Sequence, residues 1–238
     1  MKHIYVLLGN FGSGKTELAI NLAVNAALSS RTVLADLDVI NPYFRSAERK
    51  EELTSAGVKL IHPVFAYSTV EVPALSPEVY SIFTDQYDTV VIDAGGDPSG
   101  ATALGQYKNN FDLLPEGALE VLLVINPFRP FSATPELVLE LMERIRARAR
   151  IEITGLVNNA NLSTETEAEH LIAGYEQIKK VAEASNIPVA YTTGTKDNLE
   201  RFLDWAKQQN KSLQYIGKPM QITLYMHRDW DRFTRLGI

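Results

Sequence analysis

Short apolar runs separated by amphipathic stretches recur along most of the chain, and this alternation predicts an α/β fold. The runs are mostly apolar throughout, as is typical of parallel strands whose two faces are both covered. The residues that we expect in strands are 4–8, 32–35, 58–61, 89–93, 119–125, 151–157 and 188–191.

Amphipathic stretches between these runs predict helices, because their apolar residues recur at helical spacing. We expect a helix from Glu17, one from Pro135 and one over 165–186, where Leu171, Tyr175 and Ile178 share one face. Shorter helices are expected over 46–57, around 78–84 and around Leu199, Phe202 and Trp205. Residues 64–77, punctuated by proline, predict an irregular loop.

The pattern changes in the last part of the chain, residues 213–238. Residues 221–225 alternate like a strand, and Met226, Trp230 and Phe233 then fall on one helical face. Such a segment can dock on its own core, on a partner or on a membrane surface. Asp229 and Asp231 argue against the membrane, so we expect self-docking or a protein partner.

Composition describes an ordinary globular protein of 238 residues, with 45% hydrophobic and 22% charged residues. With no internal repeat or linker, we expect a single domain over 1–238 that includes 213–238 as a C-terminal docking extension. A net charge of −6 argues against general attraction to nucleic acid, and we interpret the four arginines at 144–150 as a solvated helix end.

The chain has no cysteine, and residues 1–3 run directly into the first strand. We therefore expect a cytoplasmic protein without disulfides, cysteine-bound metals or a signal peptide.

Residues 9–16, Gly-Asn-Phe-Gly-Ser-Gly-Lys-Thr, match the phosphate-binding loop G-x-x-x-x-G-K-[ST] at every fixed position, between a strand and a helix. Its glycines let backbone N–H groups surround an anion, and the helix N-terminus adds positive potential. We expect Lys15 to reach the β- and γ-phosphates and the Thr16 hydroxyl to ligate Mg²⁺. The residues expected to contact the nucleotide here are Gly9, Asn10, Phe11, Gly12, Ser13, Gly14, Lys15, Thr16 and Glu17.

Acidic residues end two predicted strands, at the sheet edge where ligands bind in open α/β folds. Asp36 and Asp38 follow 32–35, and Asp93 ends 89–93. A carboxylate there can hold Mg²⁺ directly or through water, or orient an attacking water; the alternative is an acid that only caps a turn. Gly95 and Gly96 follow Asp93 and would let a backbone N–H approach the γ-phosphate, a contact that hydrolysis removes.

Asn158 and Asn159 follow the strand 151–157 at the same expected edge. An amide offers both a donor and an acceptor, which suits the edge of a purine, so either residue is a candidate for base recognition. The alternative is that these asparagines only accommodate a tight turn.

With these motifs in this order, the chain resembles the MinD/ParA/CobQ-type P-loop ATPases of the SIMIBI class, from Met1 to about Asn210. The resemblance implies a doubly wound, mostly parallel sheet of seven or eight strands with helices on both faces, MgATP binding and slow hydrolysis. It also implies that Asp38 positions the attacking water and that Asp93 is the Walker B acid. Switch II would be 95–97, and Asn158 or Asn159 would read adenine.

One position departs from the signature of this family. Many members carry a lysine after the first loop glycine that reaches the phosphates of a partner subunit across a nucleotide-sandwich dimer; here Asn10 stands there, and Phe11 replaces a glycine. The charge that such a lysine supplies must come from elsewhere, and Arg45 is our candidate. A homodimer across the nucleotide is therefore an open expectation.

Three functions compete on this evidence. The first is a MgATP-dependent switch or accessory ATPase that is read by a protein partner; ATP is favoured over GTP because 195–198, Thr-Lys-Asp-Asn, has the wrong order for an N-K-x-D guanine motif. The second is a small-molecule kinase or ligase of the dethiobiotin synthetase kind, with 64–77 or 126–131 lining a substrate pocket. The third is a protein that partitions on DNA or membrane.

Overall fold

An eight-stranded, all-parallel sheet forms the centre of the protein in a computed structural model that describes residues 2–37, 49–61, 77–84, 86–95 and 98–226. The strand order is β3-β2-β4-β1-β5-β6-β7-β8, which confirms the predicted doubly wound α/β class. The strands are β1 (His3–Leu8), β2 (Thr32–Asp36), β3 (Val58–Ile61), β4 (Thr89–Asp93), β5 (Leu119–Ile125), β6 (Gly155–Asn158), β7 (Val189–Gly194) and β8 (Lys218–Gln221).

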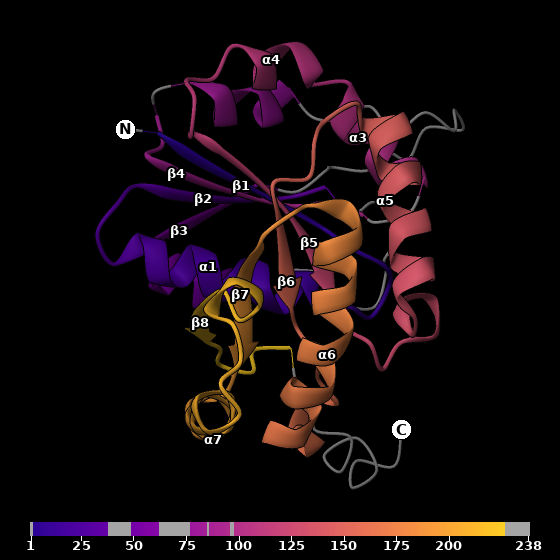
Figure 1. Ribbon diagram of the computed structural model, residues 1–238. Helices are drawn as coiled ribbons and strands as arrows, with labels where there is room; N and C mark the ends of the chain where they lie inside the picture. Colours follow the sequence, from indigo (N-terminus) through magenta and orange to yellow (C-terminus); the bar gives the residue numbers. More distant parts are fainter. Residues whose placement is uncertain (1, 38–48, 62–76, 85, 96–97, 227–238) are drawn as a thin grey trace, which may run out of the picture.

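Helices cover both faces of this sheet (Figure 1). Their bounds are α1 (Lys15–Ala27), α2 (Lys50–Ser55), α3 (Pro98–Gly105), α4 (Lys108–Asp112), α5 (Pro135–Ala149), α6 (Ala168–Ser185) and α7 (Lys196–Gln208). Short 3₁₀ helices are η2 (Pro77–Phe83), η3 (Pro130–Ser132), η4 (Ser163–Glu165) and η5 (Leu213–Tyr215). Helices α1 and α2 pack on one face, and α3 to α6 pack on the other. The segment predicted as a helix around 78–84 forms η2, a 3₁₀ helix, which is wound more tightly than an α-helix.

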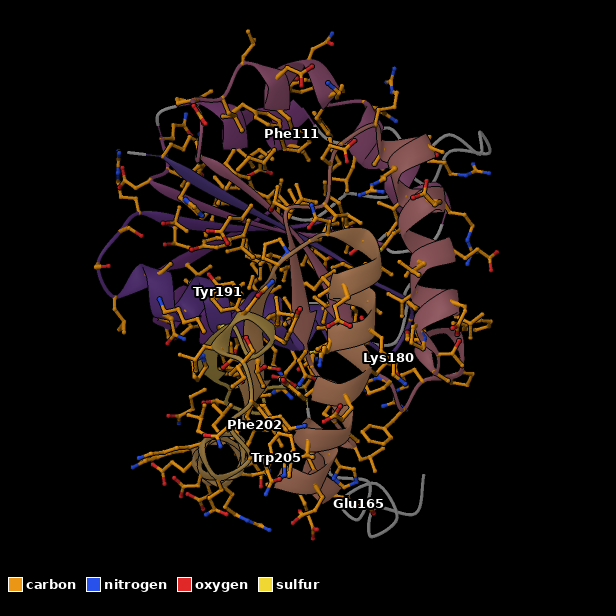
Figure 2. All side chains as sticks on the ribbon, viewed as in Figure 1. Phe111, Glu165, Lys180, Tyr191, Phe202 and Trp205 are labelled. Carbon is orange, nitrogen blue, oxygen red and sulfur yellow. The ribbon has the colours of Figure 1, made fainter. Side chains whose placement is uncertain are left out.

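The alternation of side chains along each strand divides the core into two layers. In β1, Val6 and Leu8 belong to the cluster beneath α3 to α6, whereas Leu7 packs with Leu18 of α1. A third cluster joins α6 to α7, where the rings of Phe202 and Trp205 stack with centroids 5.8 Å apart (Figure 2). Burial on both faces explains why the central strands β4 and β5 were readable as apolar runs.

The C-terminal part of the sheet differs from the sequence prediction. The last strand is Lys218–Gln221 rather than 221–225, and it pairs with β7 at the sheet edge. Beyond the bond from Ile222 N to Gly194 O, the backbone at Thr223 bonds to the side chain of Asn21 instead of a strand. The alternating pattern therefore marked an extended segment that a helix side chain holds. The predicted amphipathic tail, from Met226 onward, lies almost wholly outside the described residues.

The arginines near the end of α5 engage groups of this chain. Arg144 lies 3.9 Å from Glu140, and Arg146 lies 3.0 Å from Glu143. The Arg150 guanidinium donates to the carbonyl of Gly105. These contacts agree with a solvated helix end. In the part of the chain that the structure describes, no helix combines the length and hydrophobicity needed to cross a membrane.

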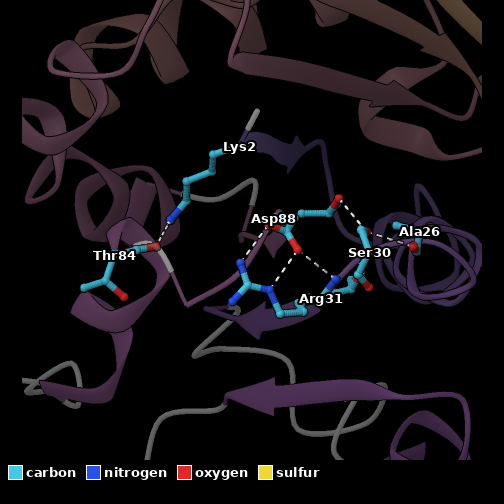
Figure 3. Close-up of polar contacts among 8 residues, drawn as sticks. Lys2, Ala26, Ser30, Arg31, Thr84 and Asp88 are labelled. Carbon is cyan, nitrogen blue, oxygen red and sulfur yellow. Dashed lines mark hydrogen bonds and ion pairs between the residues drawn. The ribbon is translucent and has the colours of Figure 1, made fainter.

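An ion pair ties the chain together at the sheet edge opposite the carboxyl ends of the strands. The Arg31 guanidinium donates to both carboxylate oxygens of Asp88, at 2.9 and 2.8 Å, and Lys2 donates to the Thr84 carbonyl (Figure 3). The hydrogen bonds from Arg31 lower the pKa of the Asp88 carboxyl from 3.8 to about 2. Because folding favours the ionised form, this group stabilises the protein at neutral pH.

Asp88→Asn is expected to lower the free energy of unfolding at pH 7. The contribution of a carboxyl with a lowered pKa is fully present above 3.8 and is lost as the pH falls through about 2. The difference between wild type and variant should therefore shrink as the pH falls from 4 toward 2, as measured by urea unfolding at several pH values. A difference that does not change with pH would contradict the assigned role.

Candidate functional site

The phosphate-loop sequence connects β1 to α1 at the carboxyl edge of the sheet, in the middle of the strand order. Its glycines adopt left-handed conformations, with φ of 76° at Gly12 and 89° at Gly14, which caps α1. A Cβ at Gly14 would lie 2.3 Å from Nδ2 of Asn159, and one at Gly9 would lie 2.4 Å from the carbonyl oxygen of Val124. Only glycine fits these positions, because both the backbone angle and the space exclude a side chain.

The first residues of α1 place two polar side chains beneath the loop. Lys15 is 6% exposed, and its ammonium donates to the carbonyl of Asn10 at 3.3 Å. The Thr16 hydroxyl donates to Oδ2 of Asp93 at 2.7 Å. That proton is committed to the carboxylate, so the lone pairs of the Thr16 oxygen remain for a cation.

Two of the predicted metal-binding acids lie side by side. Asp36 and Asp93 are paired in the register of β2 and β4, and both are buried. Together with the Thr16 hydroxyl they form a set of oxygen donors, which suits Mg²⁺, a cation that binds through one or two carboxylates, water and substrate phosphates. Among the described residues no group of three or more acidic or histidine side chains forms a metal cage.

Some predicted site residues lie outside the described parts of the chain, namely Asp38, Gly96 and Arg45. Gly95 is described and buried, and it packs against the start of α3, where a Cβ at Gly100 would lie 2.3 Å from its carbonyl oxygen. The predicted roles of all four residues stay predictions.

A cavity of about 600 Å³ opens beside the phosphate loop and extends over the ends of β6 and β7. Its lining comes from five separate segments of the chain. The lining residues are Phe11, Gly12, Gly14, Lys15, Thr16, Glu17, Arg129, Pro130, Phe131, Asn159, Ala160, Asn161, Ser163, Thr166, Thr193, Gly194, Thr195, Ile222, Leu224 and Met226. Of the loop residues predicted to contact nucleotide, Gly9, Asn10 and Ser13 are not part of this lining.

The two asparagines after β6 have different positions. Asn158 is buried, does not line the cavity, and donates to the Leu171 carbonyl of α6 at 3.1 Å. Asn159 lines the cavity, but its amide nitrogen donates to the Ser13 carbonyl at 2.6 Å and its oxygen accepts from the Thr193 hydroxyl. Asn158 is thus engaged with α6, and Asn159 braces the phosphate loop; base recognition by either residue stays a prediction.

The loop after β5 contributes residues that the sequence did not single out for the phosphate site. Nε of Arg129 donates to the Gly12 carbonyl at 3.0 Å, and the Asn10 amide donates to the Phe131 carbonyl at 2.6 Å. Arg129 is thus a second cation on the wall of the cavity, beside Lys15. Its only sequence signal was its position after a buried strand at the ligand edge.

Residues 222–226, which we call the C-terminal strap, close the cavity on the side of α1. The strap follows β8 and is bonded to Glu17 and Asn21 of α1. Burial raises the pKa of the Glu17 carboxyl, while the N–H groups of Tyr225 and Met226 act in the opposite direction. Glu17 lines the cavity, and its carboxylate binds the strap; its predicted contact with nucleotide stays a prediction.

Comparison with solved structures identifies the fold. The matches include FtsY from Mycoplasma mycoides, with 19% identity and a TM-score of 0.52 over 81% of this chain and 60% of that one. Chloroplast FtsY from Physcomitrella patens has 18% identity and a TM-score of 0.54, over 81% of this chain and 58% of that one. The signal recognition particle receptor FtsY from Elizabethkingia anophelis, in complex with GDP, has 20% identity and a TM-score of 0.50, over 81% of this chain and 57% of that one. The chain spans about three fifths of these proteins.

Scans against protein-family models and curated proteins gave no match. At such low identity the structural likeness shows the fold and does not distinguish the MinD/ParA branch from others. The chain therefore shares a doubly wound α/β fold with these FtsY structures.

Proposed function

We propose that this protein is a magnesium-dependent purine nucleoside triphosphatase that acts as a nucleotide-controlled switch. The observation that carries the proposal is the glycine-shaped loop that places Lys15 and the Thr16–Asp93 pair at the start of α1. The loop requires glycine at position 14 and leads into a buried lysine at a helix N-terminus. Such a loop is suited to bind a polyphosphate.

The residues of the site divide the work of phosphoryl transfer. Backbone N–H groups of the loop and the N-terminus of α1 bind the β- and γ-phosphates, and Lys15 neutralises their charge. Thr16 and Asp93, with Asp36 next to Asp93 in the sheet, would hold Mg²⁺, which would supply Lewis-acid stabilisation of the transferred phosphoryl group. Arg129 on the cavity wall is a second candidate, besides Arg45, for the cation that the absent signature lysine would otherwise provide. Asp38 keeps its predicted role of orienting water.

We propose ATP as the nucleotide, from the chemistry of the cavity wall. Guanine presents neighbouring N–H donors and is well matched by a carboxylate, whereas adenine presents one donor beside an acceptor. Among the described lining residues Glu17 is the one acid, and its carboxylate already accepts two backbone N–H groups. The Thr193 hydroxyl and the Asn161 amide nitrogen already donate to Asn159. The Thr193 oxygen can still accept a hydrogen bond, and the Thr195 hydroxyl can donate or accept, which suits adenine.

GTP is the second candidate, because the FtsY structure from Elizabethkingia anophelis contains GDP. Calorimetric titration of MgATP and MgGTP into the wild-type protein, followed by phosphate-release assays, tests the proposal and separates the two. We expect ATP to bind at least about tenfold more tightly than GTP, with slow release of phosphate. Tighter binding of GTP would reverse the choice of base, and binding of neither nucleotide would end the proposed function.

The kinase or ligase alternative retains one supporting observation, since Arg129, Pro130 and Phe131 line the cavity as that reading expected of 126–131. The switch predicts stimulation of turnover by a protein partner, whereas the kinase predicts a phosphorylated metabolite. Phosphate release in the absence of any added metabolite favours the switch. A homodimer across the nucleotide stays an open expectation for the switch. Sedimentation of the protein with ATP and with ADP tests it.

A further inference from the structure

The C-terminal strap supplies one wall of the cavity with alternate side chains. Ile222, Leu224 and Met226 line the cavity, while the Thr223 side chain between them is exposed. This alternation is that of an extended chain, in which successive side chains point to opposite sides. The strap therefore presents an apolar strip to a cavity whose other lining includes several polar side chains, among them Asn161, Thr193 and Thr195.

Four hydrogen bonds from two side chains of α1 hold the backbone of the strap, in addition to the bond from Ile222 N to Gly194 O at its start. The Asn21 amide donates to the Thr223 carbonyl at 2.9 Å, and its oxygen accepts from the Thr223 N–H at 2.7 Å. The Glu17 carboxylate accepts from the N–H groups of Tyr225 and Met226 at 2.6 and 3.0 Å. The same amide nitrogen of Asn21 also donates to the Glu17 carbonyl at 2.8 Å, which fixes its orientation.

The helix that holds the strap is the helix that begins at the phosphate loop. Glu17 directly follows Thr16, and Asn21 lies one turn further along the same face. The apolar wall is therefore positioned relative to Lys15 and Thr16 through one short stretch of helix. A ligand with an anionic end and a flat apolar end matches this combination.

We propose that the C-terminal strap is the wall against which the purine ring of the nucleotide packs, and that Glu17 and Asn21 are positioning residues that hold it there. The inference rests on the proposed function, because it names the part of the same site that binds the base. A purine has apolar faces and polar edges, so an apolar wall on one side and hydroxyl and amide groups at the edge suit it.

The test compares ligands that share the phosphates and differ in the base. Binding of MgATP, MgGTP and magnesium tripolyphosphate is measured by calorimetry for the wild type, Leu224→Asp and Asn21→Ala. Thr223→Ala is the matched control, because it changes the exposed side chain of the strap and keeps both backbone bonds to Asn21. Thermal unfolding of each variant establishes that it is folded.

We expect Leu224→Asp and Asn21→Ala to raise the Kd of the preferred nucleotide by about tenfold or more. Their Kd for tripolyphosphate should stay within about twofold of wild type, and Thr223→Ala should match wild type for every ligand. If Leu224→Asp does not fold, Leu224→Ala is measured instead, with an expected rise of about threefold for the nucleotide alone.

Equal losses for nucleotide and tripolyphosphate would overturn the inference, because the strap would then support the phosphate loop and not the base. Unchanged nucleotide binding in Leu224→Asp would overturn it as well. Failure of the proposed function is distinguishable from both outcomes, since it appears in the unmodified protein as an absence of nucleotide binding. That result would remove the inference along with the function on which it rests.

Discussion

Lys15→Ala is expected to weaken MgATP binding by roughly a hundredfold or more. Two unit charges about 4 Å apart in a partly screened site interact with about 4 kcal/mol, and this variant removes the buried ammonium beneath the loop. The loss should appear directly in calorimetric titration. The loop conformation itself should survive, because it is set by the glycines and by the bracing of Ser13 by Asn159 rather than by the lysine.

Lys50→Ala is the matched control for this variant. Lys50 also opens a helix on the same face of the sheet, but it is exposed and does not line the cavity. Its removal should leave MgATP binding unchanged. If Lys15→Ala bound MgATP within about threefold of wild type, the loop would not be a polyphosphate site and the proposed function would fall.

Asp93→Asn is expected to reduce the rate of ATP hydrolysis by about a hundredfold or more. The amide oxygen can still accept the hydrogen bond from Thr16, so the local packing is preserved while the negative charge that attracts Mg²⁺ is lost. Stabilisation of charge during phosphoryl transfer is where such a loss is greatest. Phosphate-release assays over a range of Mg²⁺ concentrations measure the effect.

Nucleotide binding in the presence of EDTA should be nearly the same for Asp93→Asn and wild type, which separates a metal defect from misfolding. Asp88→Asn provides the control at the opposite end of β4, where the acid is paired with Arg31 and faces away from the site. That control should hydrolyse ATP at the wild-type rate. Wild-type turnover in Asp93→Asn would show that the metal is held elsewhere.

Local sequence patterns predicted most of the sheet. The strands 89–93 and 119–125 were predicted with the bounds that the structure shows for β4 and β5. They were readable because both faces are buried, so each run is nearly all apolar. At the end of the chain, the prediction of a strand over 221–225 was wrong. An extended segment held by a helix side chain alternates in the same way as an edge strand.

The sequence by itself determined the phosphate loop and the acids Asp36 and Asp93, because a fixed spacing on a strand–loop–helix unit implies their geometry. Only the tertiary structure decided which other residues face the cavity. Arg129 and the strap at Leu224 come from segments far apart in the chain, and no local pattern encodes their approach to the phosphate loop. Parallel strands bring their carboxyl ends to one edge, so connections after different strands meet there, and the order of strands in the sheet determines which of them become neighbours.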